Sequence, residues 1–487
     1  MNKNRLRLYL GLLGVTCLLA LLAVLLSNGL LLKTRQLKVP LIKAENPAPV
    51  QAMAQRLSRA IQIETISVKN QINPNFKSLE TVFKNSFPLL WQRLSPQVIN
   101  QHGLLFHFPG KNPQEPVVLL LAHLDVVPVE SPSAWKHPPF SGTITGGYVW
   151  GRGAIDDKQS ALAILEAAES LLRQGQRPER SVYIALGYDE EIGGTQGAAT
   201  LAKALKKQGV ECGFSLDEGL AIVPGSMIGM QSPVALIGLS EKGYLSVELT
   251  AKQTGGHASM PPKETAVGIL AAALNRLQNT PFPARLGSSS REMFSWLAPE
   301  MTGASKWALA NLWLFEPLLL KQLSGKPATN ALIRTTMAPT MLQGSPQENI
   351  LPAEAKAVIN LRLLPGDTQS NTLEYLKQVI ADPRVQILAR SGFSSEAAPE
   401  SDSKGADFAL LHHTVRQVFP EVVVAPSLVL AGTDSRHYQS LCKNQYRFQP
   451  VYLTAEDLKR VHGTNERISI EAHAQAARFY LQLFKKL

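Results

Sequence analysis

The sequence predicts an α/β protein in which a mixed sheet is flanked by helices and a second, α+β domain is inserted. Three observations support this prediction. The aliphatic run at 117–121 indicates a strand buried on both faces, and it ends in two polar residues, His123 and Asp125. Strand and helix patterns then alternate to about residue 240. Beyond that point the order becomes strand, helix, strand, strand, which is typical of an α+β domain.

The length and these changes of pattern suggest the domain boundaries. A chain of 487 residues exceeds what one hydrophobic core usually organises. We therefore assign the main α/β domain to residues 48–240 and 395–487, and the inserted domain to residues 241–394. The first 40 residues form a separate unit.

That N-terminal unit is predicted to be a membrane anchor and tether. Residues 8–32 carry no charge and are rich in leucine, valine and alanine. A helix of this length spans a hydrocarbon core of about 30 Å. Lysine and arginine flank the segment equally, three on each side, so their distribution does not set the orientation. We expect a single-pass anchor with the bulk of the chain on the non-cytoplasmic side; a cleaved signal peptide is the alternative.

Charge and cysteine content exclude two classes of protein. The net charge is +11, but residues 1–45 contribute +6 of it, so a nucleic acid partner is not indicated. The three cysteines do not form a disulfide framework, and Cys212 and Cys442 can pair only if the fold brings them together.

In the main domain, polar residues recur where predicted strands end. Helices are expected at 52–63 and 79–87, then the strand that ends at His123. A short strand at 148–150 leads into a glycine-rich turn and Asp156, followed by a helix at 160–173. The strand at 181–187 is followed by Glu190 and Glu191, and after a helix at 196–208 the strand at 214–216 is followed by Asp217. Ligands bind at this edge of α/β sheets, so these side chains are expected to converge.

The inserted domain begins with an alternating strand at 245–250. A helix at 266–277 and a strand pair at 330–340 and 356–364 complete the α+β pattern. Between them, residues 287–327 hold three of the six tryptophans. Core packing is the simplest explanation of this segment, and a surface that faces lipid or an acyl group is the alternative. The α/β pattern returns with helices at 408–419 and from residue 470.

Histidine and carboxylates at these strand ends, with a late His462, are the ingredients of a carboxylate-bridged two-zinc centre. Zinc in hydrolytic sites accepts imidazole nitrogen and carboxylate oxygen, and two ions a few ångströms apart need a bridging group. The spacing of His123 and Asp125 places both on one face of an extended chain, so that Asp125 can orient the imidazole.

The motifs resemble those of the M20 metallopeptidase family, the aminoacylase-1/carboxypeptidase G2 clan. Six stretches match in order: A-H-L-D-V-V-P at 122–128, G-R-G-A-I-D-D-K at 151–158, G-Y-D-E-E-I-G-G at 187–194, S-L-D-E-G at 215–219, G-G-H-A-S at 255–259 and V-H-G-T-N-E at 461–466. The branch that contains carboxypeptidase S and the N-fatty-acyl-amino-acid synthase/hydrolase is most similar. The resemblance implies a zinc-peptidase-like catalytic domain and an inserted lid and dimerisation domain.

The resemblance also implies a role for each matching residue. It implies two Zn²⁺, with Co²⁺ or Mn²⁺ as possible substitutes, held by His123, Asp156, Glu191, Asp217 and His462, with Asp156 bridging. Glu190 is the implied general base, Asp125 orients His123, and His257 polarises the scissile carbonyl or stabilises the oxyanion. The implied substrate-binding residues are Arg362, Asn330, Gly432, Thr433, Asp434 and Ser435.

These roles predict a metal-dependent hydrolase that cleaves the amide bond to a C-terminal amino acid with a free carboxylate, as a carboxypeptidase does. Hydrolysis or synthesis of N-fatty-acyl amino acids is the alternative, and a non-catalytic binding protein on the same scaffold is a remote one. The expected partners are a small peptide or N-acyl amino acid, the membrane, and a second copy of the chain that binds through the lid.

Overall fold

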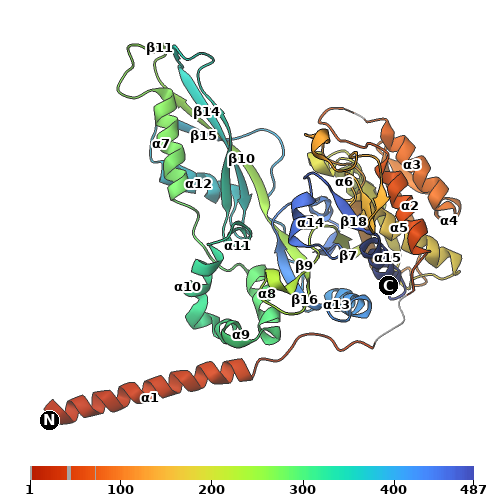
Figure 1. Ribbon diagram of the computed structural model, residues 1–487, viewed down its shortest axis with the longest axis horizontal. Coiled ribbons are helices and arrows are strands. Elements are labelled where there is room, and N and C mark those ends of the chain that lie inside the picture. Colours follow the sequence, from red (N-terminus) through yellow and green to blue (C-terminus); the bar gives the residue numbers. More distant parts are fainter. Residues whose placement is uncertain (1–2, 41–44, 72) are drawn as a thin grey trace.

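The computed structural model describes residues 3–40, 45–71 and 73–487, so the first two residues and a part of the chain that follows the predicted tether lie outside the described residues. Figure 1 shows the main domain beside a smaller inserted domain, with helix α1 (Lys3–Leu30) extending to the lower left below the inserted domain. Each domain has its own hydrophobic core. The predicted fold class is confirmed.

The central sheet of the main domain is mixed. Strand β3 pairs in parallel with β6 and β7, and β17 pairs in parallel with β7, whereas β2 runs antiparallel to β6. In spatial order the strands are β1 (Gln97–Ile99), β2 (Gly103–Phe108), β6 (Val182–Gly187), β3 (Val117–His123), β7 (Cys212–Asp217), β17 (Cys442–Arg447), β9 (Val234–Glu241) and β16 (Val423–Val429), with β8 (Ile222–Val223) beside β9. A small separate sheet has the order β18 (Arg467–Ser469), β5 (Tyr148–Trp150) and β4 (Ile144–Thr145).

Helices cover both faces of this sheet, so strand β3 is buried on both sides as its aliphatic sequence predicts. Val118 and Leu120 belong to the core beneath helices α5 and α15, and Leu119 and Leu121 belong to the cluster beneath α6. This alternation is the two-residue period of a strand. The helices of the domain are α2 (Val50–Ile61), α3 (Asn75–Ser86), α4 (Pro88–Arg93), α5 (Lys158–Arg173), α6 (Ala198–Lys207), α13 (Ala406–Val418), α14 (Ala455–Arg460) and α15 (Ile470–Phe484).

A disulfide joins Cys212 and Cys442, the first residues of the neighbouring parallel strands β7 and β17. The two cysteines lie 230 residues apart in the sequence. Their pairing therefore depends on the strand order, which no local pattern reveals.

The inserted domain, or lid, is a sheet covered by two helices. Its strand order is β12 (Thr336–Gln343), β14 (Glu354–Leu363), β10 (Gly243–Lys252) and β15 (Val385–Ala389). Helices α7 (Ala266–Asn279) and α12 (Gln369–Ile380) pack on this sheet, and a short pair of strands, β11 (Gly256–His257) and β13 (Ile350–Leu351), lies at its far end (Figure 1).

The tryptophan-rich segment packs on the main domain and not on the lid core, which corrects the boundaries that the sequence suggested. It forms helices α8 (Ser288–Leu297), α9 (Gly303–Ala310), α10 (Leu312–Leu323) and α11 (Pro327–Ala331). Met293, Phe294 and Trp296 of α8 belong to the core of the main domain, and α8 contacts β16. Core packing thus accounts for α8, whereas the described residues of α10 include none that is buried.

Candidate metal centre

Three neighbouring parallel strands carry polar residues to one edge of the sheet. Strands β6, β3 and β7 lie side by side and run in the same direction. His123 is the last residue of β3, Glu190 and Glu191 follow β6, and Asp217 ends β7. Their carboxyl ends therefore meet at the edge where α/β sheets bind ligands.

Asp156 lies between two imidazoles. Its Oδ1 is 2.9 Å from Nε2 of His123, and its Oδ2 is 3.1 Å from Nε2 of His462. The same Nε2 of His462 is 3.2 Å from Oε2 of Glu191. A carboxylate that meets each imidazole with a separate oxygen is placed to bridge two cations.

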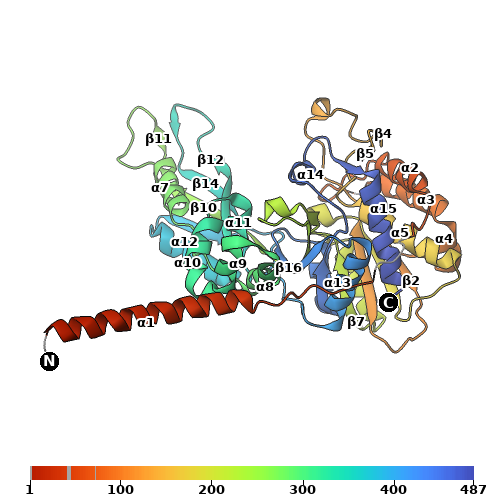
Figure 2. The same ribbon diagram turned by 60° about the horizontal axis from the view of Figure 1, so that its bottom comes forward.

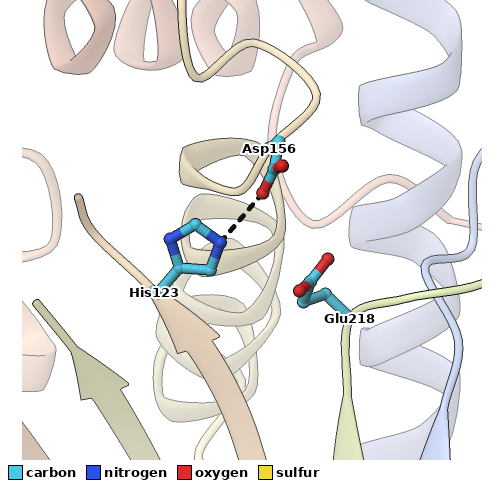
Figure 3. A group of neighbouring side chains, drawn as sticks. All are labelled: His123, Asp156 and Glu218. Carbon is cyan, nitrogen blue, oxygen red and sulfur yellow. Dashed lines mark hydrogen bonds and ion pairs between the residues drawn. The ribbon is translucent and has the colours of Figure 1, made fainter. Parts of the chain in front are cut away.

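Glu218, and not Asp217, faces this cluster. Figure 3 shows the Glu218 carboxylate beside His123 and Asp156, with which it can share one ion. The Asp217 carboxylate accepts hydrogen bonds from the backbone N–H groups of Ser435 (2.7 Å) and Glu218 (3.0 Å). Successive side chains at the end of a strand point to opposite sides. The geometry thus differs from the sequence-based expectation for Asp217.

The residues fit a pair of divalent cations. Ligand atoms of His123, Asp156 and Glu218 lie within 4.8 Å of one another, and so do those of Asp156, Glu191 and His462. The two sets share Asp156, and their imidazole and carboxylate donors suit zinc. Among the described residues, the buried Oε1 of Glu191 has no hydrogen-bond partner, as expected for an atom that a cation would satisfy.

Asp125 connects His123 to the Glu190–Glu191 turn. Its Oδ1 lies 3.3 Å from Nδ1 of His123, the nitrogen that faces away from Asp156. Its two oxygens also accept the backbone N–H groups of Glu190 and Glu191, each at 3.1 Å, and the hydroxyl of Ser67 donates at 2.6 Å. A single fully buried carboxylate therefore holds the imidazole and the backbone of both glutamates.

Glu466 holds the Asp156 loop in the same way. Its Oε1 accepts the backbone N–H groups of Ile155 and Asp156, at 2.8 and 3.2 Å. Its Oε2 accepts from Arg152 at 2.7 Å, and Arg152 also donates to the backbone carbonyl of His462 at 3.1 Å. This buried ion pair ties the two ends of the cluster together.

Burial and nearby like charges disfavour the ionised form of the carboxylates in this centre. Burial raises the pKa of Glu190 to about 8, and it also raises the pKa of Glu191. Hydrogen bonds to Asp156 and Glu191 raise the pKa of His462 to about 10. So many carboxylates in one buried place need cations beyond the two histidines.

A cationic crevice of about 560 Å³ opens beside the cluster, between the main domain and the lid. Glu190, Glu191 and His462 lie on its wall. Its basic residues are Lys69, Lys242, Arg362, Arg390 and Arg436. The guanidinium of Arg436 lies 3.4 Å from Oε1 of Glu190, and those of Arg362 and Arg436 lie over the rings of Tyr244 and Phe393, each at 4.7 Å.

The structure separates several other expected residues from this crevice. His257 is exposed on β11 at the far end of the lid, where its Nδ1 shares a hydrogen bond with the Ser259 hydroxyl at 2.7 Å (Figure 1). Asn330 lines a different, smaller cavity with Arg334. Within this chain, therefore, neither His257 nor Asn330 is among the residues that line the crevice with Arg362, in contrast to the expectation from the sequence.

The loop expected to bind substrate contributes one residue to the crevice wall. Gly432 lines the crevice, whereas Thr433, Asp434 and Ser435 are buried behind it. The Thr433 hydroxyl donates to Glu241 at 3.0 Å, and neither carboxylate oxygen of Asp434 has a hydrogen-bond partner among the described residues. Thr433 therefore holds the loop to Glu241, and none of the three residues lines the crevice.

Sequence reasoning missed Glu218, Lys242 and Arg436. Glu218 adjoins Asp217 in the S-L-D-E-G motif, so only the direction of each side chain distinguishes them. Arg436 follows the loop at 432–435 by one residue, and its contact with Glu190 depends on tertiary structure.

A family model described as peptidase family M20/M25/M40 matches residues 119–486. The chain belongs to this family. The match covers every residue of the cluster described above, and the predicted resemblance is confirmed. The chain is accordingly a metallopeptidase-family hydrolase.

Relatives resemble it over nearly their whole length. Probable carboxypeptidase S-like 2 of Dictyostelium discoideum is 39% identical over 96% of this chain and 92% of its own. The N-fatty-acyl-amino acid synthase/hydrolase PM20D1 of Homo sapiens is 39% identical over 89% of this chain and 87% of its own.

A solved structure shares the fold. The M20 family metallo-carboxypeptidase Sso-CP2 of Sulfolobus solfataricus superposes with a TM-score of 0.67 at 19% identity, over 89% of this chain and 98% of its own. At that identity the likeness concerns the fold of the M20 scaffold.

Proposed function

We propose that this M20 hydrolase cleaves the amide bond between an acyl group and an amino acid whose carboxylate is free, in the manner of a carboxypeptidase. The observation that carries the proposal is that a cationic crevice opens directly beside the anionic cluster of candidate metal ligands, and Glu191 and His462 of that cluster line the crevice. A product amino acid needs a binding site for its carboxylate, and a guanidinium is a planar bidentate donor that matches one.

Arg362 is the proposed anchor for that carboxylate. It extends from β14 of the lid into the crevice and is braced by the ring of Tyr244. Lys242 already donates to the carbonyls of Ala331 and Arg334, at 3.1 and 2.9 Å, so its ammonium is committed to the protein. Arg390 is the other basic residue on the lid side of the wall.

For the metal we propose two Zn²⁺, one held by His123, Asp156 and Glu218 and the other by Asp156, Glu191 and His462. Such ions supply Lewis acidity and lower the pKa of a bound water towards neutrality. Asp125 would keep His123 oriented for this role, and Asp217 would hold the backbone next to Glu218.

Glu190 is the proposed general base. Its carboxylate lies on the crevice wall beside Glu191, and burial raises its pKa, which makes the ionised carboxylate a stronger base. It would take a proton from the attacking water at one of its carboxylate oxygens and deliver it to the leaving nitrogen. Arg436, 3.4 Å from Oε1, would hold the carboxylate in place.

A second candidate is an N-fatty-acyl-amino acid hydrolase or synthase. A cavity of about 640 Å³ adjoins the crevice and shares Lys69, Ile192, Gly392 and Phe393 with it. Phe76 and Tyr188 also line this cavity, and they stack edge to face with ring centroids 5.6 Å apart. An apolar acyl group could occupy this space, and the relative PM20D1 carries that activity in its name.

One assay separates the two candidates. Purified chain is offered benzyloxycarbonyl-Gly-Leu and N-oleoyl-phenylalanine in parallel, with release of leucine or phenylalanine as the measurement. Faster release of leucine supports the peptidase, and faster release of phenylalanine supports the fatty-acyl hydrolase. If Glu190→Gln retains activity on either substrate, the mechanism is wrong.

We also propose a single-pass anchor and a lid-mediated homodimer. In α1, residues Tyr9–Leu30 include an 18-residue stretch with a mean hydropathy of 2.6 and no buried residue, so α1 suits a bilayer with the catalytic domain on the non-cytoplasmic side. A dimer would give the exposed His257 at the lid tip a role, because it could then reach the crevice of the second copy.

A further inference from the structure

Helix α10 exposes an apolar face. Trp313, Leu314 and Leu318 are 60%, 41% and 62% exposed, and Pro317 is exposed beside them. Positions i, i+1, i+4 and i+5 form one side of a helix. On the other side of α10, leucines 312, 319, 320 and 323 pack against the core of the main domain. The exposed face therefore belongs to a helix that is packed on the main domain, and an exposed apolar patch of this kind marks an interaction site.

Helix α9 places this face beside the carboxyl end of α1. The fully buried Asn311, just after α9, accepts a hydrogen bond from the Asn28 side chain at 2.9 Å and donates to the Leu25 carbonyl at 3.1 Å. The Trp307 ring lies against Gly29, where an added Cβ would collide with it. Figures 1 and 2 both show α9 next to this end of α1, and α10 follows α9 directly in the chain.

The chain after α1 is also bound to the main domain. Arg35 pairs with Glu292 at 3.0 Å. The Gln36 side chain donates to the Val424 carbonyl and accepts the Val424 N–H, both at 2.8 Å. These contacts fix the position of the anchor's end relative to α9 and α10.

We infer that α9 and α10 dock on the surface of the bilayer that α1 spans, an inference that rests on the proposed anchor. Residues near the carboxyl end of a spanning helix lie at the membrane interface, so Trp307 and Asn311, which touch them, lie at the same depth. A 12-residue helix rises about 18 Å and is too short to cross the hydrocarbon. It instead lies in the interface, where tryptophan is favoured. Trp313, Leu314 and Leu318 would then contact acyl chains.

The charge around this face suits lipid headgroups. Lys306 on α9 and Lys321 on α10 form no ion pair among the described residues, whereas Glu316 is paired with Arg291 at 2.9 Å and Glu292 with Arg35. The free lysines would meet phosphates, as on other interfacial helices. The docked state would hold the catalytic domain against the bilayer at a set orientation.

Nitroxide labelling of the full chain in vesicles tests this inference. Single cysteines replace Leu19, Trp313, Leu318 or Val98 in a Cys17→Ser background, because Cys17 is the free, exposed cysteine of the described chain. Leu19 reports the anchor, and Val98 on β1 is an exposed control at the edge of the main sheet. The chains are reconstituted in vesicles of phosphatidylcholine and phosphatidylglycerol, and thermal melting checks that each is folded.

The measurement is the collision rate of each label with oxygen, which concentrates in lipid, and with a water-soluble nickel chelate. We expect the ratio of oxygen to nickel collisions at 313 and 318 to be several-fold higher than at 98 and to approach the ratio at 19. Ratios at 313 and 318 equal to that at 98, with a lipid value at 19, overturn the docking but leave the anchor intact. Low collision rates with both reagents at 313 and 318 indicate a protein partner and also overturn it. A water-like value at 19 refutes the anchor and the docking together.

Discussion

Replacing Glu218 or Asp217 tests which of the two carboxylates binds the metal ion. The structure favours Glu218, whereas the motifs predict Asp217. The structure places the Glu218 carboxylate with His123 and Asp156, whereas both Asp217 oxygens accept backbone N–H groups. Glu218→Gln should therefore remove a charged ligand from one ion. Asp217→Asn should alter only a neighbour of the ligand, because an amide oxygen can still accept the Ser435 N–H.

The two substitutions should therefore lower the metal affinity by different factors. Loss of a partner outside the ligand shell costs about 10- to 100-fold in metal affinity. A change in Asp217 should fall in that range, and the loss of Glu218 should exceed about 100-fold, or roughly 2.7 kcal/mol. The assay is metal content per chain after equilibration in zinc buffers of graded free concentration, with plasma mass spectrometry as the readout.

One result would refute the assignment of Glu218 as the metal ligand. If Asp217→Asn loses one ion per chain at free zinc levels where Glu218→Gln keeps both, the assignment drawn from the structure is wrong. The double variant is the matched control: if the two carboxylates serve the same ion, its metal content should match that of the weaker single variant.

Three further predictions concern the base, the lid and the crevice. Glu190→Gln should keep its metal content by mass spectrometry yet lose about 10²- to 10⁴-fold in kcat, the usual worth of a general base; normal turnover would exclude that role. If His257 serves the crevice of a second copy, mixing inactive Glu190→Gln and His257→Ala chains should restore about a quarter of wild-type activity, because half of the dimers are mixed and one site in each is complete; no recovery after subunit exchange would contradict it. Burial lowers the pKa of Lys242 to about 7, whereas an ordinary lysine has a pKa of 10.5. Between these two values the folded state binds fewer protons than the unfolded chain. The contribution of Lys242 to stability should therefore rise with pH across this window. Urea unfolding of wild type and Lys242→Met at pH 6.5 and 9.5 measures it, and a pH-independent difference between them would refute the shift.

The sequence by itself determined the fold class and predicted most of the candidate metal ligands. The aliphatic run of β3 is long enough to identify a doubly buried strand, and the polar residues at the ends of β3 and β6 had to meet at one sheet edge. His123, Asp156, Glu191 and His462 could be named as candidate ligands because the motifs resemble those of the M20 family. The convergence of parallel strand ends accounts only for His123 and Glu191.

Only the tertiary structure decided the remaining features, because they depend on side-chain direction and on contacts between distant segments. Glu218 and Asp217 are neighbours in one motif, and the strand's alternation determines which of them faces the cluster. The pairing of Cys212 with Cys442 follows from the adjacency of β7 and β17. The tryptophan-rich segment has one composition but two environments, because α8 packs on β16 while α10 is left with an exposed face beside the end of α1.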